Sequence, residues 1–133
     1  MNCEERIARF LVVAWASPYS LIGVLLGLGG LASGGAGQLR DGVLEFHGPL
    51  IAWLLDRLPL EGVQAMTLGH TVIARHQAAL DITRAHERIH VRQFERWGCL
   101  MGPAYLACSV ALWLQGRDAY RENPFERDAY DNS

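Results

Sequence analysis

Residues 86–90 read His-Glu-Arg-Ile-His, with two histidines four positions apart and a glutamate directly after the first. The surrounding apolar residues follow the helical period, at Ile82, Ala85, Ile89, Phe94 and Trp97. Residues four apart lie on one face of a helix, so His86 and His90 can direct two imidazoles at a single metal ion. Glu87 is turned away from that line and can reach a water on the metal without binding the metal itself. The pentapeptide therefore predicts a helix that carries a metal site.

Local signals mark the limits of this helix. Asp81 is expected at the N-cap or in the first turn, and Gly98 stands where a C-terminal cap glycine belongs. The helix is then about four to five turns long at 3.6 residues per turn. The competing interpretation is a surface helix with two histidines and a solvated glutamate. Gln93 continues the line of the histidines beside the apolar face, and this position suits ligands better than a fully polar face does.

A third ligand is needed, because a catalytic zinc ion usually takes three protein ligands and a water. One source is another histidine upstream, namely His47, His70 or His76. The other is the C-terminal segment 120–130. Here Asn123 can cap a helix and Pro124 suits its first turn, which puts Glu126 at the third helical position. The spacing of Asn123 and Glu126 also fits a capping box, which is the competing interpretation of this pair.

The segments H-E-R-I-H-V-R-Q (86–93) and N-P-F-E-R-D-A (123–129) together resemble the small, membrane-associated bacterial metallopeptidases of the gluzincin type. The resemblance covers about half of the chain, from Met66 to Tyr130. It implies a minimal zincin-like core, made of a short sheet, the histidine helix and a C-terminal helix with a glutamate. It also implies that the strand before the histidine helix lines a cleft, where its free edge can accept an extended peptide.

The same resemblance implies the chemistry of the site. His86, His90 and Glu126 would hold Zn²⁺, and Glu87 would be the general base. The implied reaction is the hydrolysis of a peptide bond by zinc-activated water, on a peptide or protein substrate near a membrane.

Five further residues are candidates for supporting this site. An oxyanion in the reaction needs a second donor, and the candidates are Tyr120, Tyr130 and His70. Asp128 is a candidate acceptor for the N–H of a ligand histidine, and Asn123 a candidate support at the start of the second helix.

The N-terminal third of the chain differs in kind from the rest. No charged residue occurs from Phe10 to Leu39, and Phe10–Leu31 is long enough to cross a bilayer core, which takes about 20 residues. One alternative is a signal peptide cleaved within residues 32–37. Another is a helix broken at Ser17-Pro18, whose two short halves would form a membrane hairpin or a re-entrant element. We expect membrane insertion of some kind, with lipid as a partner and, by the resemblance, the bacterial cell membrane as the location.

A second apolar run, Cys99–Leu114, is marginal as a span. If it crossed the membrane, Glu126 would lie on the opposite side from His86 and His90, and the zinc site could not form. The run is therefore expected to be a buried core helix or an interfacial helix.

The sequence of residues 32–74 predicts short strands and a short helix. Residues 32–42 are rich in glycine and indicate a linker and turn, and residues 42–48 a strand. Residues 49–58 have helical spacing and are closed by Pro59, and residues 65–74 alternate as a strand does.

We therefore expect an α+β, mostly helical fold in two parts. Residues 1–39 would form the membrane-associated segment and linker, and residues 40–133 the zincin-like domain. The net charge is only −2, and the absence of a basic field excludes nucleic acid as a partner.

Two other classes of protein remain open. One is a membrane-anchored structural or interaction protein, with an inactive zincin-like fold or a structural metal. Glu87 argues against it, since a structural zinc site needs no general base. The other is a heme-binding membrane protein, whose histidines would be expected on separate transmembrane helices.

Overall fold

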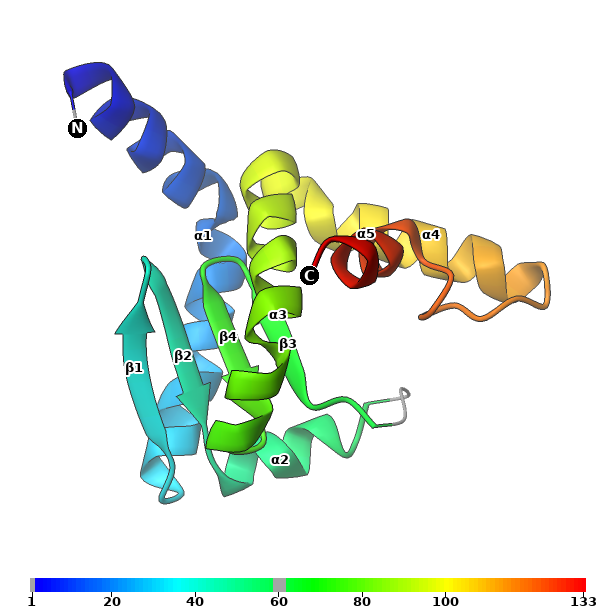
Figure 1. Cartoon of the computed structure of the whole chain (residues 1–133), viewed down its shortest axis with the longest axis horizontal. Helices are drawn as coiled ribbons and strands as arrows, with labels where there is room; N and C mark the ends of the chain where they lie inside the picture. The colour runs from blue at the N-terminus through cyan, green and yellow to red at the C-terminus, as the bar shows by residue number, and fades with distance from the viewer. Residues whose placement is uncertain (1, 59–61) are drawn as a thin grey trace.

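The computed structural model describes residues 2–58 and 62–133, and within them the chain folds as a mostly helical α+β protein with a four-stranded mixed sheet (Figure 1). This confirms the expectation of an α+β, mostly helical fold. The elements are α1 (Cys3–Ala32), β1 (Ala36–Arg40), β2 (Val43–His47), α2 (Pro49–Leu55), β3 (Ala65–Leu68), β4 (Thr71–Ala74), α3 (Gln77–Trp97), a short 3₁₀ turn η1 (Gly98–Leu100), α4 (Met101–Leu114) and α5 (Pro124–Asn132).

The strands lie in the order β1-β2-β4-β3, so that β1 and β3 form the two edges of the sheet. β1 is antiparallel to β2, and β2 is parallel to β4. β3 and β4 form an antiparallel hairpin whose turn contains Gly69 at φ 63°. That backbone conformation costs glycine little and other residues more, because glycine lacks a Cβ.

Helices cover both faces of the sheet, with α3 on one side and α1 and α2 on the other (Figure 1). The core under α1 and α2 contains Phe46, Ile51, Leu55 and Ile73. The core under α3 contains Val43, Ala65, Val72, Ala74, Ala79, Leu80 and Val91. Each large side chain buried in this way contributes about 1.5–3 kcal/mol, so both cores hold the layers together.

α1 packs on the sheet through a stripe of small residues that includes Gly23, Gly27 and Gly30. A Cβ placed on Gly27 would lie 2.3 Å from the ring of Phe46, so only a residue without a side chain allows this close approach. The boundary expected between residues 39 and 40 falls inside β1. Residues 1–39 contribute α1 and most of β1 to the packed layers.

The interpretation of α1 as a helix broken at Ser17-Pro18 is wrong, because α1 continues through Pro18. Proline cannot donate a backbone hydrogen bond to the carbonyl of Ala14, four residues earlier. The hydroxyl of Ser17 donates to that carbonyl instead, at 2.8 Å. The local side chain thus compensates for the lost backbone bond.

The middle of the chain agrees in part with expectation. The strand at 42–48 and the helix that begins at Pro49 are confirmed as β2 and α2, while Pro59 lies outside the described residues. The linker expected at 32–42 is wrong in part, since β1 pairs there with β2. The single strand expected at 65–74 is a hairpin of two strands.

The histidine helix α3 has 21 residues and is longer than expected. It begins four residues before Asp81, because the Nδ1 atom of His76 caps the amide of Ala79 at 3.0 Å. It ends before Gly98, as expected, and the φ angle of Gly98 is 54°.

α4 projects away from the rest of the fold (Figure 1). Most of its apolar side chains are exposed, among them Leu106, Val110, Trp113 and Leu114. Of the two roles expected for the run 99–114, the buried core helix is thereby excluded.

Candidate metal centre

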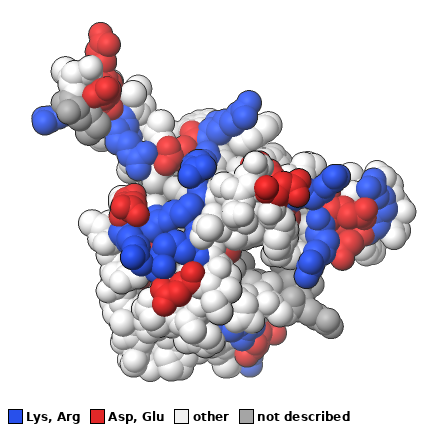
Figure 2. All heavy atoms as spheres, viewed as in Figure 1, with Lys and Arg blue, Asp and Glu red and all other residues white. Residues whose placement is uncertain are grey.

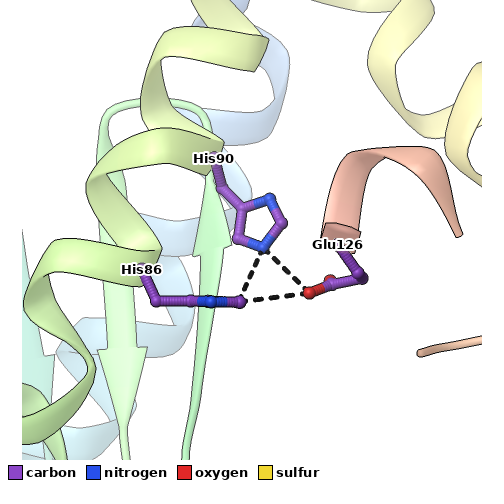
Figure 3. A group of neighbouring side chains, drawn as sticks. All are labelled: His86, His90 and Glu126. Carbon is purple, nitrogen blue, oxygen red and sulfur yellow. Dashed lines mark hydrogen bonds and ion pairs between the residues drawn. The ribbon is translucent and has the colours of Figure 1, made fainter. Parts of the chain in front are cut away.

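His86 and His90 of α3 meet Glu126 of α5 in a compact group (Figure 3). The two Nε2 atoms are 3.2 Å apart, and Oε2 of Glu126 lies 3.1 Å from His86 Nε2 and 3.2 Å from His90 Nε2. Donor atoms bound tetrahedrally to one zinc ion at about 2.0–2.2 Å lie roughly 3.4 Å from each other. The three atoms therefore form the face of a coordination tetrahedron almost without rearrangement.

α5 is held in place by Asn123, whose side chain is fully buried. Its Oδ1 accepts from the amide of Phe125, and its Nδ2 donates to the carbonyl of Tyr105 and the hydroxyl of Ser109 on α4. Asn123 and Pro124 thus start the helix as expected. The competing capping box does not form, because both carboxylate oxygens of Glu126 engage side chains, namely His86, His90 and Tyr105.

Gln93 links the two helices of the site. Its Oε1 lies 2.8 Å from Nδ1 of His90, and its Nε2 donates to the carbonyl of Phe125 and to Oδ2 of Asp128, both at 2.9 Å. Because the amide oxygen can only accept, Nδ1 of His90 carries the proton and Nε2 keeps its lone pair for a metal. Asp128, expected to accept from a ligand histidine directly, acts through Gln93 instead.

Three tyrosines surround the group. The hydroxyl of Tyr105 donates to Oε1 of Glu126 at 2.8 Å, which leaves Oε2 directed at the histidines. The ring of Tyr130 packs on His86 with centroids 4.4 Å apart. The hydroxyls of Tyr120 and Tyr130 are 3.3 Å apart, so both candidate donors lie beside the site.

Glu87 is buried beside the ligand group and is held by β3. The hydroxyl of Thr67 donates to its Oε2 at 2.6 Å. Burial raises the pKa of Glu87 above its usual value, although the charge of His90 and the bond from Thr67 act in the opposite direction. A carboxylate whose pKa is raised toward neutrality is a better general base than an ordinary one.

The charges of the ligand group are coupled. Burial opposes ionisation of Glu126, but its hydrogen bonds with His86 and His90 outweigh that effect and lower its pKa to about 2. Burial likewise favours neutral His90, but the hydrogen bond and negative charge of Glu126 raise the pKa of His90 above its usual value. The site thus favours a positive charge between the ligand atoms, and a bound metal ion can provide it.

His70 lies elsewhere in the fold. Its Nε2 is 3.2 Å from Oε1 of Glu95, which also pairs with Arg9, and its amide donates to the hydroxyl of Ser20 on α1. His70 therefore joins α1 to α3 and does not line the pocket of the metal group. The structure does not bring it to the site as an oxyanion donor.

A pocket of about 310 Å³ adjoins the site. Glu87, His90, Glu126 and Tyr120 line one part of it. Most of the remaining wall is apolar and comes from α1, α3, α4 and the edge strand β3, with Tyr19, Met66, Leu68, Phe94, Met101 and Leu106. The pocket can therefore admit an apolar group next to the candidate ligands.

Sequence reasoning missed the roles of three residues at this site. The sequence places Gln93 on the histidine face but gives it no partner, and it gives Thr67 and Tyr105 no role at the site. Two signals are available: the three-residue spacing of His90 and Gln93 on one helix, and the inward position of Thr67 on a strand just before that helix. The bonds of these residues to Glu87, Asp128 and Glu126 join positions 20 or more apart, so local periodicity does not reveal them.

Comparisons with protein families, with curated proteins and with solved structures find no match to this chain. The functional argument therefore depends on the geometry of the site alone.

Proposed function

We propose that this protein is a membrane-associated, zinc-dependent metallopeptidase with a minimal zincin-like core made of the sheet, α3 and α5. The observation that carries the proposal is the convergence of His86, His90 and Glu126, with the buried Glu87 beside them. Two imidazole nitrogens and one carboxylate oxygen are a typical ligand set for catalytic zinc.

The residues of the chain have separate roles in this mechanism. His86, His90 and Glu126 would hold the ion, which when bound supplies a water of lowered pKa and polarises a carbonyl group. Glu87 accepts a proton from the attacking water and later donates it to the leaving amine. Thr67 fixes one oxygen of Glu87 and so orients the other for this transfer. Tyr120, which lines the pocket, is the best-placed donor to the oxyanion.

The surroundings of the site support a peptide substrate with an apolar residue. β3 is an edge strand and lines the pocket through Ala65–Leu68. An extended peptide can add to such an edge through its backbone. The apolar part of the pocket then accommodates a side chain of the substrate next to the scissile bond.

The test compares zinc content and cleavage of a peptide library in three variants. Glu87→Gln keeps the size of the side chain but removes its basicity, so zinc content should stay near wild type while activity falls about 10²-fold or more. Glu126→Ala deletes a ligand, so zinc content and activity should fall together. Glu4→Gln, at an exposed position in the first turn of α1, is the matched control and should retain both.

Other outcomes contradict parts of the proposal. Loss of zinc in Glu87→Gln would make Glu87 a ligand or a structural residue. Full zinc content in Glu126→Ala would place the third ligand elsewhere. A wild-type protein that binds zinc but cleaves no peptide would support the second candidate function, a non-catalytic membrane-anchored protein with a structural metal.

A further inference from the structure

Two helical runs are long and apolar enough to cross a bilayer, α1 and the run Gln77–Leu114 that joins α3 to α4. Length and composition alone do not distinguish a helix that crosses the membrane from one that lies on it. The contacts of α1 with the rest of the fold make this distinction.

The domain lies along almost the whole length of α1. Near the N-terminus, Arg9 pairs with Glu95 of α3 at 3.1 Å. In the middle, the hydroxyl of Tyr19 donates to the carbonyl of Cys99 and accepts from the amide of Gly102. Near the C-terminus, Gly23, Gly27 and Gly30 pack on Thr71, Phe46 and Ile51.

A crossing α1 would need a stretch of about 20 residues that is free of the domain. Within α1, Cys3–Ala8 precede the ion pair of Arg9 with Glu95, and at 1.5 Å per residue they span about 9 Å. If residues 9–30 crossed the bilayer, the sheet would enter the hydrocarbon with them. The fully exposed edge strand β1 would then lose water as a partner for its free backbone groups.

The outward face of α1 is apolar. Seven large side chains are exposed on the side opposite the glycine stripe, at about 100° per residue: Ile7, Phe10, Leu11, Leu21, Ile22, Leu25 and Leu28. Phe10, Leu21 and Leu25 are 70%, 62% and 61% exposed. On the face of the molecule that Figure 2 shows, charged side chains gather around α3, at the outer ends of α1 and α4, and in a smaller group near α2.

α4 carries a second exposed apolar surface. It meets α1 where Gly102 contacts Tyr19, and its exposed side chains are Leu106, Val110, Trp113 and Leu114. Arginines flank both apolar runs, with Arg9 and Arg40 around residues 10–39 and Arg96 and Arg117 around residues 97–116. This distribution complements a bilayer, in which anionic headgroups border the hydrocarbon.

We propose that α1 lies in the plane of one membrane leaflet, with the outward faces of α1 and α4 in lipid and the sheet and α3 on the aqueous side. The chain is then bound to one side of the membrane and does not cross it. The pocket of the metal site, walled in part by Tyr19 of α1 and Leu106 of α4, lies next to the lipid surface. This inference goes beyond the proposed peptidase activity and does not require a metal.

Accessibility of cysteines tests the orientation. Cys3 is exposed before the apolar run, and Leu39→Cys adds an exposed thiol after it, both in a Cys99→Ala/Cys108→Ala background. Each thiol is labelled in a variant that carries it alone, with Cys3→Ala added to the Leu39→Cys variant, by a membrane-impermeant maleimide in spheroplasts and in inside-out vesicles. The proposal requires both to react from the same side of the membrane. Reaction from opposite sides would show that α1 crosses and would overturn it.

Flotation tests the lipid face itself. Wild type should float with vesicles of phosphatidylcholine and phosphatidylglycerol, and Leu21→Glu/Leu25→Glu should lose most of that binding with its zinc content and circular dichroism unchanged. Leu39→Glu, at an equally exposed leucine on β1, is the matched control and should float. The proposal would be overturned if the wild type does not float with the vesicles and stays in the soluble fraction, as a monomer or an oligomer. Unchanged flotation of the double variant would also overturn it. Neither result would alter the zinc measurements that test the peptidase proposal.

Discussion

Replacing Gln93 with methionine should weaken zinc binding and destabilise the fold together. Methionine has a similar length but cannot accept from Nδ1 of His90 or donate to Phe125 and Asp128. The position is only 7% exposed, so water replaces these partners poorly. A buried polar group without a partner costs about 1–3 kcal/mol, and here the N–H at Nδ1 of His90 loses its acceptor, while Phe125 and Asp128 each lose a donor.

The loss of zinc affinity in Gln93→Met can be estimated separately from the loss of fold stability. Groups that orient a ligand histidine typically contribute about 10–100-fold to metal affinity. That range corresponds to about 1.4–2.7 kcal/mol, since each factor of ten is 1.4 kcal/mol. We therefore expect the Kd for zinc of Gln93→Met to rise about 10–100-fold, measured by competition with a chromogenic chelator.

Two further variants make the reasoning refutable. Gln93→Glu keeps an acceptor for His90 but places a carboxylate beside Asp128, so it should lower the Tm while retaining most of the zinc affinity. Gln115→Met, at an exposed position after α4, should change neither quantity. If Gln93→Met is folded and binds zinc within about two-fold of wild type, Gln93 does not orient His90.

Three more predictions concern packing and pH. Gly27→Val should lower the Tm, at a cost of about 1–3 kcal/mol or more from overpacking against Phe46, whereas Leu25→Ala in detergent should not; an unchanged Tm for the glycine variant would refute the contact. Zinc affinity should fall with decreasing pH from a higher pH than for an ordinary histidine, because the pKa of His90 is raised and a proton on its Nε2 must leave before the metal binds; a flat profile between pH 8 and pH 5.5 would contradict this. Without metal, the lowered pKa of Glu126 adds stability that is present above its unfolded value of about 4.3 and is lost as pH falls toward 2. The raised pKa of His90 adds stability that is full below about 6.5 and is lost as pH rises through the raised value, so Glu126→Gln should flatten the dependence of Tm on pH at both ends.

The local features of the site follow from the sequence alone. The apolar period around residues 82–97 predicts α3, and the spacing of His86 and His90 places both on one face of it. Asn123 and Pro124 predict the start of α5. These features depend on interactions within one or two helical turns, where side-chain spacing determines which groups can meet.

The start of α3 shows the limit of such reasoning. Asp81 has the residue type of an N-cap, yet His76 caps the helix and Asp81 pairs with Arg84 in its second turn. The core under α3 extends the helix toward its N-terminus through Ala79 and Leu80, which are almost fully buried. Packing against the sheet therefore decides where the helix begins.

Tertiary structure alone decides how the separate parts of the site and of the exposed apolar surface meet. Gln93 and Asp128 are 35 positions apart, and Thr67 and Glu87 are 20 apart, so their pairing depends on how α5 and β3 pack on α3. The composition of α1 requires apolar surroundings but does not distinguish lipid from protein. The glycine stripe packs on Phe46 and its neighbours in the sheet, and the leucines on the opposite face remain exposed. The difference arises because burial depends on which surfaces meet in three dimensions, and segments distant in sequence supply those surfaces.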